Sequence, residues 1–97
     1  MAVVIWTVEF ASDLDNLLAY LEEQGAATAI KNILKRIREK SDQIAKYPES
    51  GQDSQKVENV RSVKIGKHHR MYYQIFDDTL ALVAFIDLRR DPAKNPF

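Results

Sequence analysis

The chain of 97 residues contains no cysteine and only three glycines and three prolines. The absence of cysteine excludes a disulfide scaffold, a thiolate metal site and a cysteine nucleophile. No apolar run approaches the ~20 residues of a membrane-spanning helix, and no signal-peptide pattern opens the sequence. Net charge is also absent, because 14 basic side chains balance 14 acidic ones. We therefore expect a single domain over residues 1–97, cytoplasmic and without a membrane partner.

The zero net charge conceals an uneven distribution along the chain. Residues 1–30 contain five acidic side chains and no basic one, whereas residues 61–76 contain four basic side chains, two histidines and no acidic one. A neutral protein of this kind can still present a basic surface to phosphate or to an acidic protein. The alternative is that the helix and sheet surfaces merely differ in sign, without a functional consequence.

Hydrophobic periodicity predicts two helices in the first half of the chain. An apolar segment at residues 3–8 comes first and is predicted to be a strand covered on both faces. Ser12 precedes an apolar stripe with helical spacing, as a capping residue would, and Gly25 ends that helix. A second, longer helix is expected over residues 26–47, before Pro48. So short a connection predicts an antiparallel helical hairpin.

Three strand-like segments follow a polar loop. They cover residues 59–65, 68–76 and 79–88, and tight-turn sequences separate them, so we expect a three-stranded antiparallel meander. The last segment is the most apolar and is predicted to be the central strand. The fold class is therefore α+β, with two helices packed on one face of a small sheet. The proline-containing tail should leave the sheet, so no segment remains to cover the other face.

Strand alternation predicts the side chains on that uncovered face. Within residues 68–76, His68, Arg70 and Tyr72 alternate with apolar residues that should point toward the helices. Arginine can bridge phosphate oxygens, tyrosine can stack on a base, and histidine can carry a proton near neutral pH. Cleavage of RNA by its own 2′-hydroxyl needs a proton acceptor, a proton donor and a cation. The alternative is an ordinary solvated strand face.

Two arginines end the last predicted strand. Arg90 can share the uncovered face with Arg70, whereas Arg89 can pair with Asp87 or Asp91. The sequence shows no spacing typical of metal ligands, since adjacent histidines cannot face the same way on a strand. It also contains no glycine-rich phosphate loop, because its glycines are isolated. We expect neither a metal nor another cofactor.

Several short motifs, taken in order, resemble the RelE/ParE superfamily of toxins from bacterial type II toxin–antitoxin systems. They are Pro48-x-x-Gly51, Val60-Arg61-Ser62-Val63, His69-Arg70-Met71-Tyr72-Tyr73-Gln74-Ile75, Asp77-Asp78 and Arg89-Arg90-Asp91-Pro92. The resemblance covers almost the whole chain and implies a sheet whose face opposite the helices is the concave site. It also implies a cognate antitoxin that wraps the toxin with an extended or helical segment, in a hetero-oligomer.

The resemblance leaves two targets open. RelE-like members cut messenger RNA on the ribosome without a metal, whereas ParE-like members inhibit DNA gyrase and lack the catalytic set. By position, Arg70 and Arg90 match arginines of the cleaving members, and Arg61 lies near one of their lysines. A second lysine position is Val63 here, and their C-terminal tyrosine has no counterpart.

We therefore expect a growth-inhibiting toxin whose target is DNA gyrase. One alternative is a ribosome-dependent endoribonuclease with Arg70, Arg90 and His68 as catalytic residues, and another is an inactive antitoxin-binding module. The residues expected to bind the target are Arg61, Lys64, Lys67, Tyr72 and Arg89.

Overall fold

A computed structural model describes residues 2–97 of the chain. The first half forms a short strand and two helices, namely β1 (Val3–Trp6), α1 (Val8–Glu23) and α2 (Ala27–Lys46). The second half forms four strands, namely β2 (Gln52–Asp53), β3 (Val60–Ile65), β4 (His69–Phe76) and β5 (Thr79–Asp87). Two 3-10 turns, η1 (Pro48–Ser50) and η2 (Pro92–Lys94), lie before β2 and in the tail. No helix within residues 2–97 has both the length and the apolar character needed to cross a membrane.

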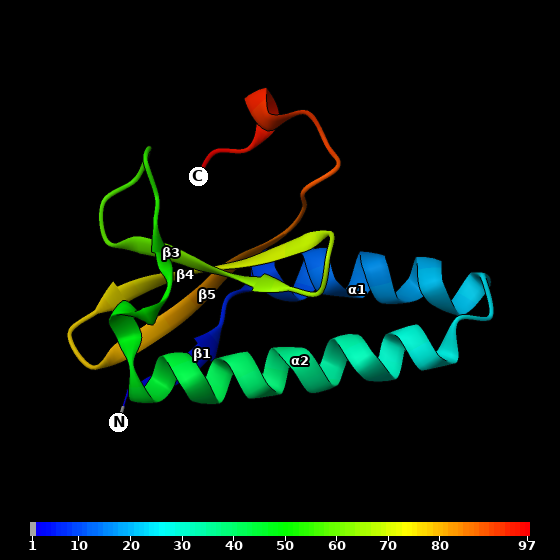
Figure 1. Cartoon of the computed structure of the whole chain (residues 1–97), viewed down its shortest axis with the longest axis horizontal. Coiled ribbons are helices and arrows are strands. Elements are labelled where there is room, and N and C mark those ends of the chain that lie inside the picture. The colour runs from blue at the N-terminus through cyan, green and yellow to red at the C-terminus, as the bar shows by residue number, and fades with distance from the viewer. Residues whose placement is uncertain (1) are drawn as a thin grey trace.

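The five strands form one mixed sheet in the order β1-β5-β4-β3-β2. Strands β3, β4 and β5 pair antiparallel, as the predicted meander requires, and β1 joins the sheet parallel to β5. Both helices lie on one side of the sheet, so the predicted α+β class is confirmed (Figure 1). Strand β5 is internal, as its apolar sequence indicated, although β4 holds the middle position.

Helix α1 begins earlier than predicted, at Val8, with Thr7 as its cap in place of Ser12. The hydroxyl of Thr7 accepts a hydrogen bond from the Phe10 amide at 3.2 Å and donates one to the Leu82 carbonyl at 2.7 Å. Capping by a threonine hydroxyl satisfies one of the amides that a helix leaves unpaired at its start. The bond to β5 fixes the cap, and it joins residues 75 positions apart, which local sequence patterns do not reveal.

Strand β1 is not covered on both faces, contrary to the prediction. It forms an edge of the sheet, where Val3, Ile5 and Trp6 are 59%, 47% and 52% exposed. An all-apolar strand is normally an internal one, which is why the sequence indicated burial. Here the apolar side chains lie at the margin of the sheet instead, and this leaves an exposed hydrophobic edge.

The main core lies between the sheet and the helices and contains Tyr73, one of its fully buried side chains. The Tyr73 hydroxyl donates to the Pro48 carbonyl at 2.6 Å and accepts from the Gly51 amide at 3.0 Å. A Cβ atom at position 51 would lie 2.9 Å from the Ser62 carbonyl oxygen, so only glycine fits. This network anchors the segment after α2 to the middle of the sheet.

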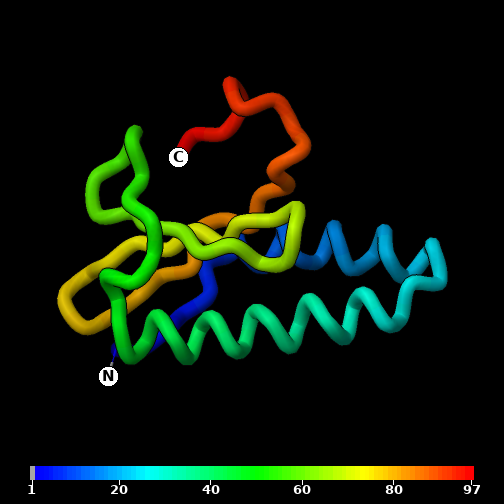
Figure 2. Tube along the Cα trace, viewed as in Figure 1, coloured from blue at the N-terminus to red at the C-terminus, as the bar shows by residue number. Residues whose placement is uncertain are grey.

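The face opposite the helices is not left uncovered, because the C-terminal tail returns to it (Figure 2). The Phe97 ring stacks on Tyr72 with centroids 5.1 Å apart, and the Asn95 side-chain amide donates to the Tyr72 hydroxyl at 3.0 Å. The Ser54 hydroxyl donates to the Phe97 carbonyl at 2.6 Å. The tail does leave the sheet, as predicted, but it folds back because Tyr72 and its neighbours offer an apolar surface to Phe97.

Replacing Phe97 by alanine should lower the free energy of unfolding by ~1 to 2 kcal/mol, because it removes an aromatic pair and uncovers Tyr72. Urea denaturation followed by circular dichroism measures the change, with the exposed Lys94→Ala in the same tail as the control. Equal urea midpoints for Phe97→Ala and wild type would show that the tail is not held on the sheet in solution.

Candidate functional site

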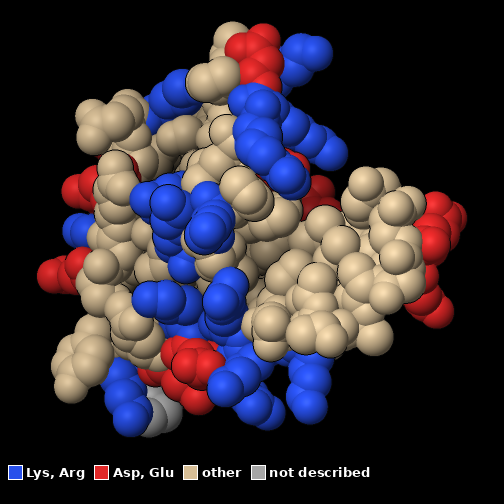
Figure 3. Space-filling view, turned by 45° about the vertical axis from the view of Figure 1, so that its right-hand side comes forward, with Lys and Arg blue, Asp and Glu red and all other residues tan. Residues whose placement is uncertain are grey.

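Basic side chains gather on the hairpin formed by β3 and β4. Lys64 and Lys67 are exposed, Arg70 is half-buried, and Lys64 lies directly across from Arg70 in the paired strands. Figure 3 shows Lys and Arg side chains grouped toward the middle of one face, with most acidic side chains at its margins. We call Lys64, Lys67 and Arg70 the basic cluster and add to it Arg36 of α2, which reaches the turn between β3 and β4. Such a cluster attracts phosphate or an acidic protein surface.

Helix α2 adds Arg36 to the cluster, a residue that sequence reasoning missed. A Cβ atom at position 66, in the turn between β3 and β4, would lie 2.8 Å from Nη1 of Arg36. Gly66 has a φ of +67°, a conformation that glycine adopts easily, and it leaves room for the guanidinium. In the sequence Arg36 is one of several basic residues of the helix, and nothing in their spacing shows which of them reaches the sheet.

Arg70 is oriented by a neighbouring strand. Its Nη1 donates to the Ser62 hydroxyl at 2.8 Å, and Ser62 is buried. Strand alternation places Arg70 on the face opposite the helices, as predicted. Since a guanidinium has five N–H donors, this bond leaves others for an anionic partner.

Two residues predicted beside Arg70 occupy other environments. His68 lies in the turn before β4 and is exposed, because the strand begins at His69. Tyr72 lies on the face of Arg70, but Phe97 covers its ring and leaves it only 6% exposed. In this structure the Tyr72 ring is therefore closed to a stacking base.

Arg61 is separated from Arg70 by the sheet. It lies directly across from Tyr73, whose side chain is in the core on the helix side. Nη1 of Arg61 donates to the Gly51 carbonyl at 2.8 Å, and its Nη2 lies 3.5 Å from Asp53. These contacts hold the segment around β2, so the structure does not bring Arg61 to the face that carries Arg70.

The two arginines after β5 differ in their surroundings. Arg89 makes two hydrogen bonds to the Asp87 carboxylate, at 3.0 and 2.8 Å, so Asp87 is its partner and not Asp91. This bonding holds the pKa of Asp87 well below its usual range. Arg90 is exposed and lines a hollow beside Ile86, which lies across from Arg70 on β5. Arg90 is therefore at the rim of the face that carries Arg70.

The depressed pKa of Asp87 predicts a specific dependence of stability on pH. A carboxylate whose pKa is lower in the folded state stabilises the fold above its unfolded pKa of roughly 4, and the contribution disappears as the pH falls below that value. Urea midpoints of wild type should therefore fall more between neutral and strongly acidic pH than those of Asp87→Asn. The exposed Asp42→Asn in α2 is the control, and identical profiles for Asp87→Asn and wild type would contradict the prediction.

Within residues 2–97, no group of three histidine or carboxylate side chains is arranged to hold a metal ion. The face of Arg70 and its rim carry the basic cluster and Arg90. Guanidinium and ammonium groups bind anions and neutralise developing charge.

The first strand, the helical hairpin and the mixed five-stranded sheet define a small α+β fold with a basic surface. A family model described as "ParE toxin of type II toxin-antitoxin system, parDE" matches residues 4–92. The chain therefore belongs to the ParE toxin family, within the RelE/ParE superfamily that its motifs resemble.

A solved structure described as "Chromosomal ParDE TA system from P. aeruginosa" has a similar fold. The TM-score is 0.73 at 15% sequence identity, and the match covers 92% of this chain and 98% of that chain. At this identity the likeness concerns the fold alone. A search of curated proteins finds no match.

Proposed function

We propose that this protein is a growth-inhibiting toxin that acts on DNA gyrase and is neutralised by a cognate antitoxin. The match to the ParE toxin family over residues 4–92 carries the proposal. The similar solved structure supports it, because its description names a ParDE toxin–antitoxin system.

The placement of the arginines favours gyrase over the ribonuclease alternative. Cleavage needs several cations and a proton carrier around one phosphate. Arg70 and Arg90 lie on or beside one face, but Arg61 is bound to the Gly51 carbonyl on the other side of the sheet. The tail after Arg90 contains no tyrosine, and Tyr72 is covered. The basic cluster is the observation that favours RNA as a second candidate target.

The exposed edge of the sheet is the surface that we assign to the antitoxin. Sheet edges are normally protected by charges or proline, yet residues 2–8 contain neither, and Val3 and Ile5 are exposed. An extended apolar segment that pairs with β1 would bury these side chains and satisfy the outer backbone groups of the strand. The face opposite the helices was the expected docking surface, but the tail already covers its part around Tyr72.

Induced expression in a bacterial host without the antitoxin tests the proposed target. We expect growth arrest with relaxed or broken plasmid DNA and intact messenger RNA, both sampled within minutes of induction. Early messenger cleavage would replace gyrase by the ribosome as the target. Growth without arrest would leave only an antitoxin-binding module.

Within this experiment, Arg70→Ala should restore colony formation by roughly tenfold or more, because it removes a charge-assisted contact to an anionic partner. Arg38→Ala, an exposed basic residue of α2, serves as the matched control and should leave the arrest unchanged. Equal arrest by wild type and Arg70→Ala would exclude Arg70 from the target-binding surface.

A further inference from the structure

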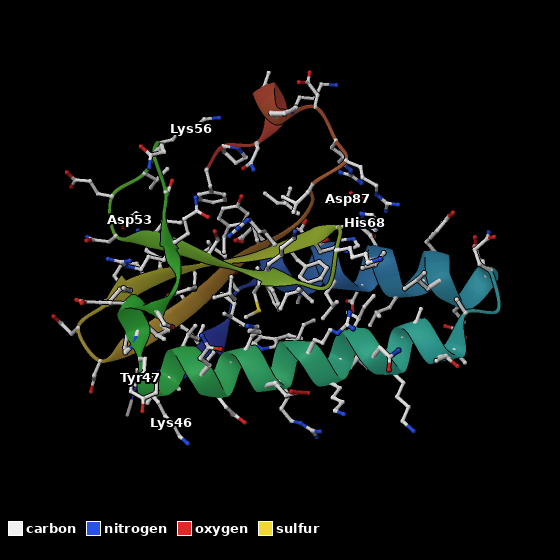
Figure 4. The ribbon with its side chains drawn as sticks, viewed as in Figure 1. Lys46, Tyr47, Asp53, Lys56, His68 and Asp87 are labelled. Atoms are coloured by element: carbon white, nitrogen blue, oxygen red, sulfur yellow. The ribbon has the colours of Figure 1, made fainter. Side chains whose placement is uncertain are left out.

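A hollow of about 430 Å³ lies between α1 and the end of the sheet formed by β4 and β5. It is on the helix side of the sheet, and Arg90, at the rim of the face that carries Arg70, also lines it. Figure 4 shows Asp87 and His68 at this end of the sheet, above α1, and His69 lies across from Asp87 in the paired strands. Apart from Arg90, the proposed toxin activity uses no residue of this hollow. The volume of the hollow is in the usual range of small-molecule sites, ~300 to 1,000 Å³.

Aromatic rings from three elements, β4, β5 and α1, line the hollow. The His69 ring stacks on Phe85 with centroids 5.1 Å apart and an angle of 18° between the planes. Burial lowers the pKa of His69, which favours the neutral form of its imidazole. Tyr20 lines the hollow from α1 and is 58% exposed. A neutral ring and an exposed phenol favour a planar aromatic ligand, because stacking on such side chains is the usual way in which proteins hold a base.

One face of α1 supplies polar groups to the same hollow. Asp13, Asn16 and Tyr20 are spaced so that they share this face. The Phe85 amide donates to Oδ2 of Asp13 at 3.0 Å, which orients the carboxylate and leaves its other oxygen as an acceptor. The Asn16 amide is both donor and acceptor. Together these groups match the edge of a base that carries an amino group and a ring acceptor or carbonyl.

Two arginines complete the lining. Arg89 is bound to Asp87, whereas the Arg90 side chain makes no ion pair or hydrogen bond within residues 2–97. A free guanidinium beside an aromatic hollow suits a phosphate group. A cationic side chain of a partner protein would fit this hollow less well, because Arg89 and Arg90 would repel it.

We infer that this hollow binds a nucleotide whose base carries an amino group. The base lies against His69, Asn16 and Asp13 recognise its edge, and Arg90 holds the phosphate. The same chemistry is offered by a free nucleotide and by an unstacked base of a single-stranded nucleic acid. The inference stands independently of gyrase as the target, so either can fail without the other.

Titration of the purified protein with GMP, followed by NMR of backbone and side-chain amides, tests the inference. We expect saturable shifts at Asn16 and His69. Asn16→Ala and Tyr20→Ala should each weaken binding roughly tenfold, the scale of losing one base contact. Both residues are exposed, so their replacement leaves the core intact, and the exposed Tyr47→Ala at the far end of α2 is the control.

Two further probes separate the sources of the ligand. Saturation by GMP with no added affinity for a short guanine-containing single strand supports a free nucleotide. Tighter, salt-dependent binding of that strand, weakened by Asn16→Ala, supports an unstacked base of a nucleic acid. Equal binding of GMP and ribose 5-phosphate would overturn the inference, because it would show phosphate binding without base recognition. Absence of saturable shifts at millimolar GMP would overturn it as well.

Discussion

Replacement of Tyr73 by alanine is expected to lower the free energy of unfolding by about 4 kcal/mol, the usual cost of emptying a buried aromatic site. Tyr73 is fully buried, and its hydroxyl bonds both the Pro48 carbonyl and the Gly51 amide. A domain of this length has a total stability of roughly 5 to 15 kcal/mol, so the variant retains little margin. Urea denaturation followed by circular dichroism measures the change.

Two further variants separate the ring from its hydroxyl. Tyr73→Phe keeps the packing but leaves the Gly51 amide and the Pro48 carbonyl without their partner, at an expected cost of ~1 to 3 kcal/mol. Tyr47→Ala removes a tyrosine that is 66% exposed and should change the stability by less than about 0.5 kcal/mol. If Tyr73→Ala were no more costly than Tyr47→Ala, the hydroxyl network would not anchor the segment after α2.

The second large effect concerns binding of the antitoxin. Val4→Pro and Ile5→Lys should each weaken this binding about a hundredfold, the usual effect of losing a central contact of an interface. The Val3 amide donates to the Asp78 carbonyl at 2.8 Å, and the Thr7 amide donates to the Leu82 carbonyl at 3.1 Å. The backbone amides of Val3 and Thr7 therefore point toward β5. Backbone alternation then directs the Val4 amide outward. Proline at position 4 removes that donor without breaking the bonds to β5.

Ile5→Lys tests the same edge through its side chain. It places a charge on an apolar residue that is 47% exposed, where an added strand would bury it. Isothermal titration with the purified antitoxin measures the affinity, and circular dichroism checks the fold. Tyr47→Lys, a similar change at an exposed residue away from the edge, is the control. Full neutralisation of both β1 variants would place the antitoxin elsewhere on the toxin.

Much of the architecture was predictable because local signals set the ends of its elements. Gly25 adopts a φ of +66° just after α1, and Pro48 follows the end of α2, as their chemistry requires. Apolar segments joined by tight turns were enough to predict the meander of β3, β4 and β5. These features depend on neighbouring residues alone.

The errors concern contacts between residues far apart in the sequence. Thr7 is a cap because it also reaches Leu82, and the tail returns because Ser54 and Tyr72 hold Phe97. Periodicity shows that β1 is apolar but not whether it lies inside the sheet or at its edge. The cap at Thr7, the return of the tail and the edge position of β1 all depend on tertiary contacts, which a local sequence pattern does not contain.

The candidate site divides in the same way. Alternation alone placed Arg70 on the face opposite the helices, whereas the position of Arg61 needed the pairing register between β3 and β4. Arg36 joins the basic cluster only because α2 crosses the turn that contains Gly66. Its identity could not be read from a helix with many similar basic residues.

The parallel pairing of β1 with β5 has a consequence for the order in which the chain acquires its structure during translation. Val3 pairs with Thr79, so the first strand to be synthesised has no neighbour until the last strand has been made. Pairing of such distant segments is slow, because the entropic cost of closing a long loop comes before any stabilising contact forms. A nascent chain whose β5 has not yet left the ribosome therefore lacks a finished sheet. The folded toxin therefore forms only after β5 has been synthesised and has paired with β1.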